Sequence, residues 1–286
     1  MNTFTIRMFT EADVPAGMRL KRAAGWNQTE ADWRRAMRLQ PDGCYAGVCD
    51  GDIVATLTTC IFGSVAWVAM VLTDPAYRGR GFASRLLERA LGDLRRRGVE
   101  SIRLDATDLG RPVYEKFGFT VDFVLHRWDG VVAAIDREEL PPDTILRDSR
   151  ADDLPAITEL DRRVSGCDRG KFLAGLQAEA SGPGLFVECS GRPGGFALQR
   201  SGEFAVQLGP LGATNAANAE LLLRRSLHRT RGMRAFVDVR SGCSGMDAVL
   251  RYAGLGVQRD FQRMTLGFKF AESNASSWVS SGPEKG

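Results

Sequence analysis

The chain has 286 residues, 44% of them hydrophobic and 26% charged, with a formal net charge of +3. This composition describes an ordinary globular protein long enough for two domains, and the small net charge argues against a nucleic-acid partner. No apolar stretch approaches the length of a membrane span and no signal-peptide pattern opens the chain, so we expect a cytoplasmic protein without a membrane partner.

The first helix start that the sequence marks lies near residue 30. The helix holds Trp33, Ala36 and Met37. Asn27 and Thr29 precede it, and either side chain can cap it, because short polar side chains accept hydrogen bonds from the first amides of a helix.

A strand, a helix and a second strand follow. The apolar run Val65–Leu72 predicts the first strand, and the alternation over Ile102–Asp105 predicts the second. Gly98 marks the end of the intervening helix, and strand, helix and strand at this spacing predict a βαβ unit. The apolar positions of the helix recur every three or four residues: Phe82, Ala83, Leu86, Leu87, Ala90, Leu91 and Leu94.

The loop before this helix has the composition of a polyanion site. Gly79 and Gly81 let the backbone approach a phosphate, and Arg78 and Arg80 offer charge-assisted hydrogen bonds. The helix N-terminus adds unpaired amides and a partial positive charge. A glycine-rich turn with two solvated arginines is the alternative. The common nucleotide motifs fit poorly, because Pro75 ends the strand early and no Gly-Lys-Ser/Thr follows.

Two motifs at the expected separation point to a family. Arg78-x-x-Gly81-x-Ala83 resembles the Gln/Arg-x-x-Gly-x-Gly/Ala loop of the GNAT superfamily of N-acetyltransferases, and Tyr114 to Phe119 resembles its Tyr-x-x-x-Gly-Phe segment. The resemblance covers roughly residues 3 to 128. It implies an α/β (α+β) fold in which a mixed, mostly antiparallel sheet is flanked by helices.

The resemblance also implies acetyl-coenzyme A (acetyl-CoA) as the cofactor, with its pyrophosphate on the amides of residues 79 to 84. No metal is expected. The residues expected to bind the cofactor are Val71, Leu72, Thr73, Arg78, Gly79, Arg80, Gly81, Phe82, Ala83, Ser84, Asp105 and Tyr114.

Acyl transfer to an amine needs a polarised carbonyl, a neutral amine and a proton for the departing thiolate. In the family, a backbone N–H near a bulge in the fourth strand polarises the carbonyl, which corresponds here to about Val71 or Leu72. Tyr114 matches the position of the phenol that protonates the thiolate; packing against the sheet is the alternative role.

The general base is open. The family often uses a Glu on the fourth strand, but Ser64 to Leu72 contains no carboxylate. Asp105 follows the next strand and is either a contact for the pantetheine arm or a base acting through water. Backbone carbonyls and water are a third option, and our hypothesis is that no single residue is an essential base. Trp26 and Asn27 fall in the region that forms the acceptor lid in the family, although Trp26 also fits a core position.

The second half of the chain repeats the first. Arg7 and Asp13 match Arg147 and Asp153, at an offset of 140 residues in both cases (147 − 7 and 153 − 13). We therefore expect tandem GNAT-like domains, with a catalytic domain over 1–136, a linker over 137–145, a second domain over 146–270 and a flexible tail over 271–286, in which Trp278 is the one residue able to dock.

The repeat is asymmetric where chemistry is expected. Asp105 has a counterpart in Asp238, but the glycines and arginines of the loop are replaced by Thr214 to Ala219, and Leu250 stands in the place of Tyr114. We interpret the second domain as a degenerate one that shapes the acceptor cleft.

The six cysteines show no metal-ligand spacing, and neither of the two histidines pairs with a cysteine in a recognisable motif. We expect free thiols, with Cys44 and Cys60 in the core. The resulting prediction is an acetyl-CoA-dependent N-acetyltransferase that acts on a primary amine of a small molecule by direct attack in a ternary complex, as a monomer or homodimer. The alternatives are a non-catalytic acyl-CoA sensor and a transferase of another acyl group.

Overall fold

The structure, a computed structural model, describes residues 3–133, 135–136, 139–179, 182–270 and 278–284. The elements of the first half are β1 (Phe4–Met8), α1 (Val14–Ala23), α2 (Glu30–Leu39), β2 (Cys44–Cys49), β3 (Asp52–Phe62), β4 (Val65–Thr73), α3 (Phe82–Arg96), β5 (Ser101–Ala106), α4 (Arg111–Lys116) and β6 (Thr120–Val131).

The second half follows the same order. Its elements are β7 (Thr144–Asp148), α5 (Leu154–Ser165), α6 (Gly170–Glu179), β8 (Leu185–Cys189), β9 (Arg192–Arg200), β10 (Val206–Ala213), α7 (Ala216–Arg229), β11 (Arg234–Arg240), α8 (Ser244–Tyr252), β12 (Gly256–Gly267) and the added β13 (Trp278–Val279). Single 3-10 turns stand at Glu11–Asp13, Pro75–Tyr77 and Ala151–Asp153.

The repeat expected from the sequence extends to a duplicated ion pair. Arg7 Nη1 lies 2.6 Å from Asp13 Oδ2, and Arg147 Nη1 lies 2.7 Å from Asp153 Oδ2. In both halves the arginine comes from the first strand and the aspartate from the turn that opens the first helix. Equivalent residues therefore make equivalent contacts, which confirms the tandem arrangement.

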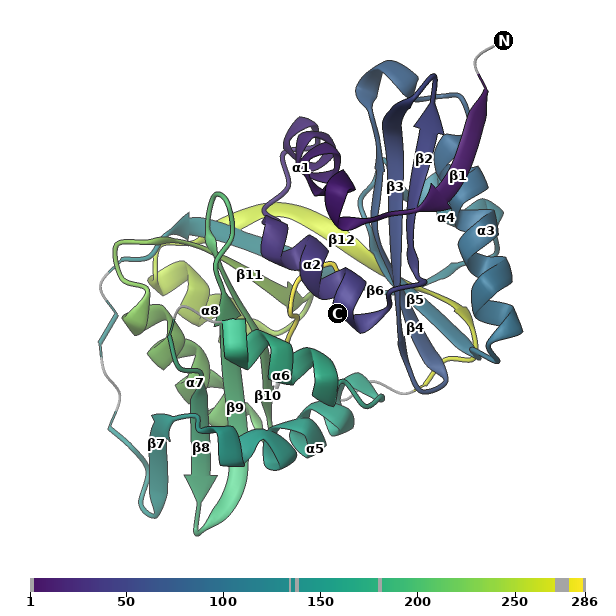
Figure 1. The fold of residues 1–286 in the computed structure, drawn as a ribbon. Coiled ribbons are helices and arrows are strands. Elements are labelled where there is room, and N and C mark those ends of the chain that lie inside the picture. The colour runs from purple at the N-terminus through teal and green to yellow at the C-terminus, as the bar shows by residue number, and fades with distance from the viewer. Residues whose placement is uncertain (1–2, 134, 137–138, 180–181, 271–277, 285–286) are drawn as a thin grey trace.

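All thirteen strands join one sheet with helices packed on its faces (Figure 1). The order is β1-β2-β3-β4-β5-β12-β6-β11-β10-β9-β8-β7, with β13 beside β10. Within the described residues, β4 with β5 and β10 with β11 run parallel and the other pairs run antiparallel. This confirms the expected mixed, mostly antiparallel sheet, and the parallel β4–β5 pair confirms the βαβ unit.

The last strand of each half is exchanged with the other half. β12, from the second half, lies between β5 and β6, and β6, from the first half, lies between β12 and β11. Each half of the sheet is therefore completed by a strand from the other. The limits 1–136 and 146–270 remain a prediction about sequence units, and in space the two units interlock.

Two buried ion pairs join the exchanged strands to their new neighbours. Arg263 of β12 binds Asp105 of β5, with Nε 2.5 Å from Oδ1 and Nη2 3.1 Å from Oδ2. Arg127 of β6 binds Asp238 of β11, with Nε 2.8 Å from Oδ1 and Nη2 2.7 Å from Oδ2. A buried bidentate pair is stable only when both partners are in place, so these reciprocal pairs favour the exchanged arrangement.

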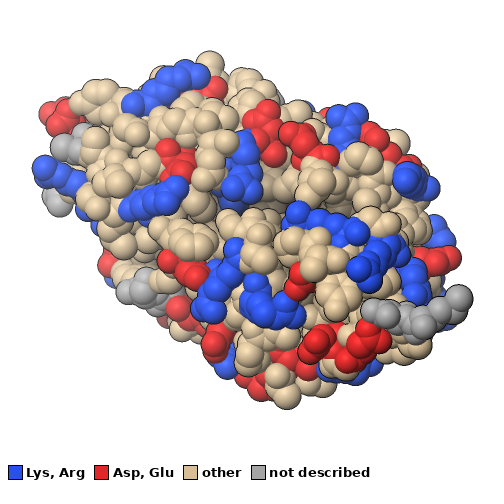
Figure 2. Space-filling model, turned by 90° about the horizontal axis from the view of Figure 1, so that it is seen from above, with Lys and Arg blue, Asp and Glu red and all other residues tan. Residues whose placement is uncertain are grey.

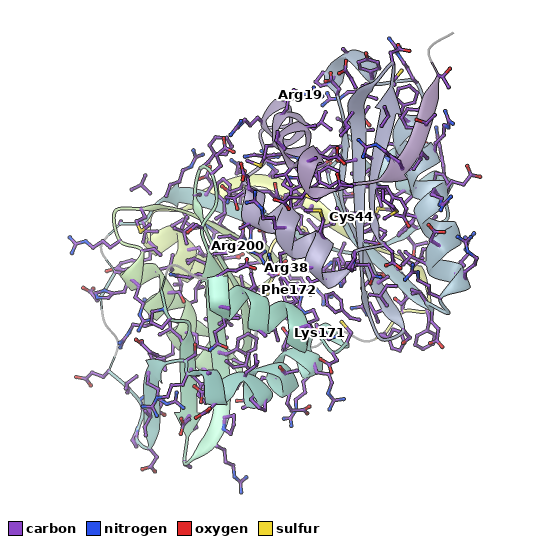
Figure 3. All side chains as sticks on the ribbon, viewed as in Figure 1. Arg19, Arg38, Cys44, Lys171, Phe172 and Arg200 are labelled. Carbon is purple, nitrogen blue, oxygen red and sulfur yellow. The ribbon has the colours of Figure 1, made fainter. Side chains whose placement is uncertain are left out.

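Helices α2 and α6 add a polar contact between the halves. Arg35 Nη2 of α2 lies 2.6 Å from Glu179 Oε2 of α6, and Arg200 Nη1 at the end of β9 lies 3.1 Å from Asp32 Oδ2. Figure 3 shows Arg200 and Phe172 in the middle of the molecule, where the two halves meet. Helix α2 of the first half is thus covered by the second half.

The expectation of a flexible tail is wrong for residues 278–284. Trp278 is 5% exposed and stands edge-on to Phe123 at a centroid distance of 6.2 Å, so its docking is confirmed. Glu284 is 8% exposed. The polar composition suggested solvent, but partners in both halves meet these side chains. The rest of the expected tail, 271–277 and 285–286, lies outside the described residues.

Two further expectations concern the core and the membrane. Cys44 and Cys60 are buried, as predicted. Among the helices of the described chain, none combines the length and the apolar character needed to cross a bilayer.

Candidate active site

Strands β4 and β5 separate partway along the sheet. They pair over Val65–Trp67 and Ser101–Arg103, whereas β4 continues to Thr73 and β5 to Ala106. Beyond Trp67, one edge of β4 is left for another hydrogen-bonding partner, because backbone amides that lose a strand partner need a replacement.

A bulge interrupts β4 at this separation. Thr56 pairs with Leu72 and Thr58 with Ala69, so Met70 and Val71 both face the single residue between them on β3. Met70 has a φ of 50°, and its carbonyl accepts a hydrogen bond from Thr56 Oγ1 at 2.9 Å. The bulge lies beside the residues for which the sequence predicted it.

The anion loop ends at an open helix N-terminus. Gly79 and Gly81 both have a φ of 76°, a left-handed conformation that favours glycine, and Gly81 is the N-cap of α3. A glycine cap has no side chain to bind the first amides of the helix, those of Phe82, Ala83 and Ser84. Arg78 is exposed, like both glycines. These amides can therefore donate hydrogen bonds to a bound anion.

The equivalent helix of the second half is closed. Asn215 is the N-cap of α7, and its Oδ1 accepts a hydrogen bond from Asn218 N at 2.9 Å. Leu250, which replaces the tyrosine, is fully buried in the core. The second half thus lacks an open helix N-terminus at this position and lacks the phenol, which supports the interpretation that it is degenerate.

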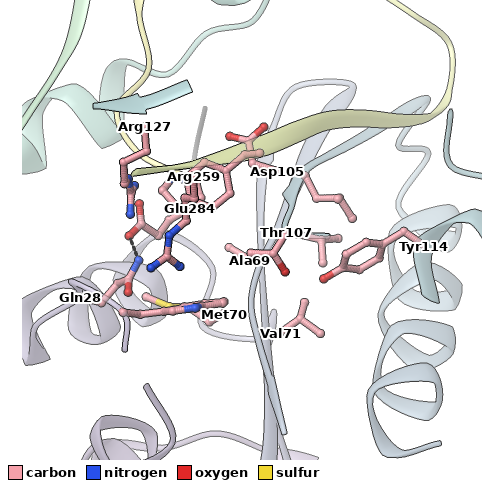
Figure 4. A pocket seen from close by; sticks show the side chains of 15 residues that line it. Gln28, Ala69, Met70, Val71, Asp105, Thr107, Tyr114, Arg127, Arg259 and Glu284 are labelled. Carbon is pink, nitrogen blue, oxygen red and sulfur yellow. Dashed lines mark hydrogen bonds between the residues drawn. The ribbon is translucent and has the colours of Figure 1, made fainter. Parts of the chain in front are cut away.

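Tyr114 reaches the separated strands from α4. Its side chain is 8% exposed, and it stands edge-on to Phe119 at a centroid distance of 6.0 Å. Its hydroxyl points toward β4, between Thr107 and Val71 (Figure 4). Burial raises the pKa of Tyr114 well above its ordinary value of 10, since the charged phenolate is poorly solvated there. The phenol therefore stays protonated at neutral pH.

A pocket connects Tyr114 with the loop between α1 and α2. Of the residues predicted from the sequence, Trp26, Val71, Asp105 and Tyr114 line it together. The other lining residues are Gln28, Val68, Ala69, Met70, Leu104, Thr107, Arg127, Arg259, Phe261, Pro283 and Glu284.

The remaining predicted residues lie close by. Leu72 is buried on the core side, and Thr73 pairs with Ala55 of β3, so neither side chain lines the cavity. Residues 78 to 84 form the turn that begins α3, which packs against β3 and β4.

Asp105 is placed differently from the base that was considered. Both its carboxylate and the Arg263 guanidinium are 1% exposed, and the carboxylate turns toward β12 rather than toward Tyr114 (Figure 4). A carboxylate neutralised by a bidentate arginine is a poor proton acceptor, because protonation would remove the negative charge from a buried ion pair. We interpret Asp105 as a structural anion.

Asn27 is also placed differently from the acceptor contact that was expected. Its Oδ1 accepts hydrogen bonds from Phe204 N at 2.9 Å and Ala205 N at 3.1 Å, and its Nδ2 donates to Ala205 O at 2.9 Å. The amide thus fastens the α1–α2 loop to the β9–β10 loop. Thr29, the alternative N-cap, caps α2 through a capping box with Asp32.

Sequence reasoning missed Gln28, Arg259 and Glu284. Gln28 adjoins the predicted acceptor residues, so the signal for it was available. Arg259 and Glu284 come from the second half and from the expected tail, and no motif marks them.

Comparisons with known proteins agree with this arrangement. A model of the acetyltransferase (GNAT) family matches residues 8–119, and a second acetyltransferase (GNAT) domain model matches residues 157–278. The chain is 24% identical to the uncharacterized N-acetyltransferase YitH of Bacillus subtilis over 221 residues, which are 75% of each chain.

Solved structures extend the likeness over the whole chain. A putative acetyltransferase from Pyrococcus horikoshii superimposes with a TM-score of 0.82 at 20% identity, over 99% of this chain and 96% of that one. A tandem GNAT protein from the clavulanic acid biosynthesis pathway superimposes with a TM-score of 0.66 at 14% identity, over 96% and 100%. The chain belongs to the GNAT superfamily and is an acyltransferase with two tandem GNAT domains. The family generally takes its acyl group from acetyl-CoA.

Proposed function

We propose that this protein transfers the acetyl group of acetyl-CoA to a primary amine of a small molecule, by direct attack in a ternary complex. The observation that carries the proposal is the open N-terminus of α3 on one side of the separated strands, with the protonated Tyr114 at the cavity between them.

The donor seat follows from the local chemistry. The amides of residues 79 to 84 bind the pyrophosphate, and Arg78 and Arg80 add charge-assisted hydrogen bonds. A Cβ on Gly79 or Gly81 would meet no atom within 4 Å, so the seat is open above both glycines. The free edge of β4, over Val71, Leu72 and Thr73, pairs with the amide groups of the pantetheine arm.

The thioester supplies the acyl group when the donor is bound. A backbone N–H at Val71 or Leu72, held by the bulge, donates to the acyl oxygen. The amine nitrogen forms the new C–N bond, and the electrons of the C–S bond leave with sulfur, which takes the proton of Tyr114. The amine proton passes to water, from which Tyr114 is protonated again.

Protonation of the departing sulfur by Tyr114 depends on the pKa values of the thiol and the phenol. A thiol in water has a pKa near 8.5, below that of a phenol. The burial that raises the pKa of Tyr114 also raises that of a thiolate beside it, because both anions lose solvation. Because the free thiol is the stronger acid, Tyr114 gives up its proton only while the C–S bond breaks and charge develops on the sulfur. Asp105 is paired, so no side chain is assigned as an essential base.

The acceptor is a small molecule, in keeping with a pocket in which Trp26, Pro283 and Glu284 stand in the same lining as Tyr114. The face seen in Figure 2 carries basic and acidic side chains interspersed, a pattern that gives no single-sign field for a polyanionic macromolecule.

The test is the release of coenzyme A with a panel of small amines, for the wild type and for Tyr114→Phe. We expect Tyr114→Phe to bind the donor normally and to lower kcat by roughly 10²–10⁴-fold, the effect of losing a general acid. Tyr45→Phe is the matched control, since its hydroxyl is also buried but donates to Asp93 at 2.6 Å, away from the cavity. Donor binding without transfer to any amine would contradict the proposal and favour an acyl-CoA sensor.

A further inference from the structure

Four charged side chains line the cavity, and three of them belong to ion pairs. Asp105 and Arg127 belong to the ion pairs of the exchanged strands, and Glu284 Oε1 accepts a hydrogen bond from Arg200 Nη2 at 2.8 Å. Arg259 differs from them. Its described hydrogen bond goes to the neutral amide oxygen of the neighbouring Gln258, and the described part of the chain places no carboxylate in an ion pair with it. Among the described residues, Arg259 is therefore the charged side chain of the lining that has no ion-pair partner.

The position of Arg259 is costly for the free protein. In the antiparallel register of β12 and β6, Arg259 lies directly opposite Arg127, and like charges at such positions destabilise a sheet. Burial, and then the charge of Arg127, lower the pKa of Arg259 below its ordinary value. Figure 4 shows its guanidinium directed into the cavity, toward Gln28 and Met70. A bound anion would relieve both effects.

Gln28 supplies a second unsatisfied group in the same wall. Its side chain is 1% exposed, and its Nε2 donates to Glu284 Oε1. This contact fixes the orientation of the amide, since the opposite orientation would place two oxygens together. Its Oε1 has no hydrogen-bond partner in the described structure. A buried acceptor without a donor is unfavourable, so this oxygen calls for an N–H or O–H from a ligand.

We propose that the acceptor is a small amine that carries a carboxylate, of the amino-acid class, and that Arg259 binds this carboxylate. Gln28 Oε1 accepts a hydrogen bond from the same molecule. Both groups lie on the α1–α2 side of the cavity, so the amine is directed toward the bulge at Met70 and Val71, where Tyr114 faces it. This inference rests on the proposed acetyl transfer and names its acceptor class.

The first experiment compares amino acids with their carboxamides, in which an uncharged amide replaces the carboxylate. Coenzyme A release should give the wild type a kcat/KM about 10- to 100-fold higher for the carboxylates, the range expected for a charged hydrogen bond. Arg259→Gln should reduce this ratio to near one. Arg192→Gln, which removes an exposed arginine of β9 outside the cavity, should leave the ratio unchanged.

A second experiment separates this inference from the reaction itself. Calorimetry measures the binding of N-acetyl amino acids and their carboxamides to the wild type and to Arg259→Gln without turnover. Carboxylate binding that depends on Arg259 supports the inference even if no amine is acetylated, in which case only the proposed function fails. Equal binding of both ligand series, or transfer to amines with a ratio that Arg259→Gln does not alter, overturns the inference and leaves acetyl transfer standing.

Discussion

Substitution of Asp105 by Asn tests whether this carboxylate is structural or catalytic. Both partners of the Asp105–Arg263 pair are 1% exposed, so the substitution removes the carboxylate of a buried ion pair. Breaking one side of such a pair costs about 3–5 kcal/mol. For a chain of this size that corresponds to a fall in the melting temperature of roughly 6–20 °C, at about 2–4 °C per kcal/mol.

The reciprocal pair provides the matched control. Asp238→Asn leaves Arg127 unpaired in the same way, so we expect a similar fall in melting temperature, measured by differential scanning calorimetry. Combining Asp105→Asn with Arg263→Gln removes both charges and should recover most of the stability. If Asp105→Asn melts like the wild type but loses turnover with donor binding intact, the structural assignment is refuted and the base role returns.

The other predictions concern the anion loop and acid stability. Gly81→Ala places a Cβ at a φ of 76°, which should lower the free energy of unfolding by about 1–2 kcal/mol and weaken donor binding. Gly98→Ala, with a φ of 73° at the other end of α3, should lower the free energy of unfolding by the same amount and leave donor binding unchanged. Calorimetric titration with coenzyme A distinguishes them, and equal binding losses would disprove the seat. Arg7 lowers the pKa of Asp13 to about 2, below the value near 3.9 of an unfolded chain, so its contribution is full above about pH 4 and disappears as the pH falls toward 2. Asp13→Asn should therefore reduce the melting temperature at pH 6 but only slightly at pH 2. Asp152→Asn, which removes an exposed carboxylate, is the control and should show no such pH-dependent reduction. An equal reduction by Asp13→Asn at both pH values would contradict the linkage.

The sequence predicts the local elements of the site well, because their signals lie within a few residues of each other. The spacing of apolar residues and Gly98 locate α3, which the structure places at Phe82–Arg96. The matched positions of Arg7 and Arg147 reveal the duplication, because each arginine pairs with an aspartate only six residues away. Short-range patterns of this kind need no knowledge of the sheet order.

The exchange of strands was not predictable in the same way. Asp105 meets an arginine 158 residues further along the chain, and β6 carries no mark that assigns it to one neighbour rather than another. One signal was present. Asp105 recurs as Asp238 in the half that lacks the anion loop and the tyrosine. An aspartate that is present in both halves is therefore better explained by a structural role than by a catalytic one.

Polar segments misled the sequence-based prediction for the same reason. Asn27 was expected to meet a substrate, and the tail was expected to meet water, because polar side chains are usually exposed. Asn27 and Glu284 are both buried by distant parts of the chain: Phe204 and Ala205 bond Asn27, and Gln28 and Arg200 donate to Glu284. The composition of a segment indicates its polarity but not which distant residues will contact it.

The crossing of β6 and β12 has a practical consequence for handling this protein. A cut between the halves would give two fragments that each carry a strand belonging in the sheet of the other, so neither fragment reproduces its half of the molecule. Two separate polypeptides that traded the same strands would come apart on dilution, whereas here the covalent connection makes the assembly independent of protein concentration.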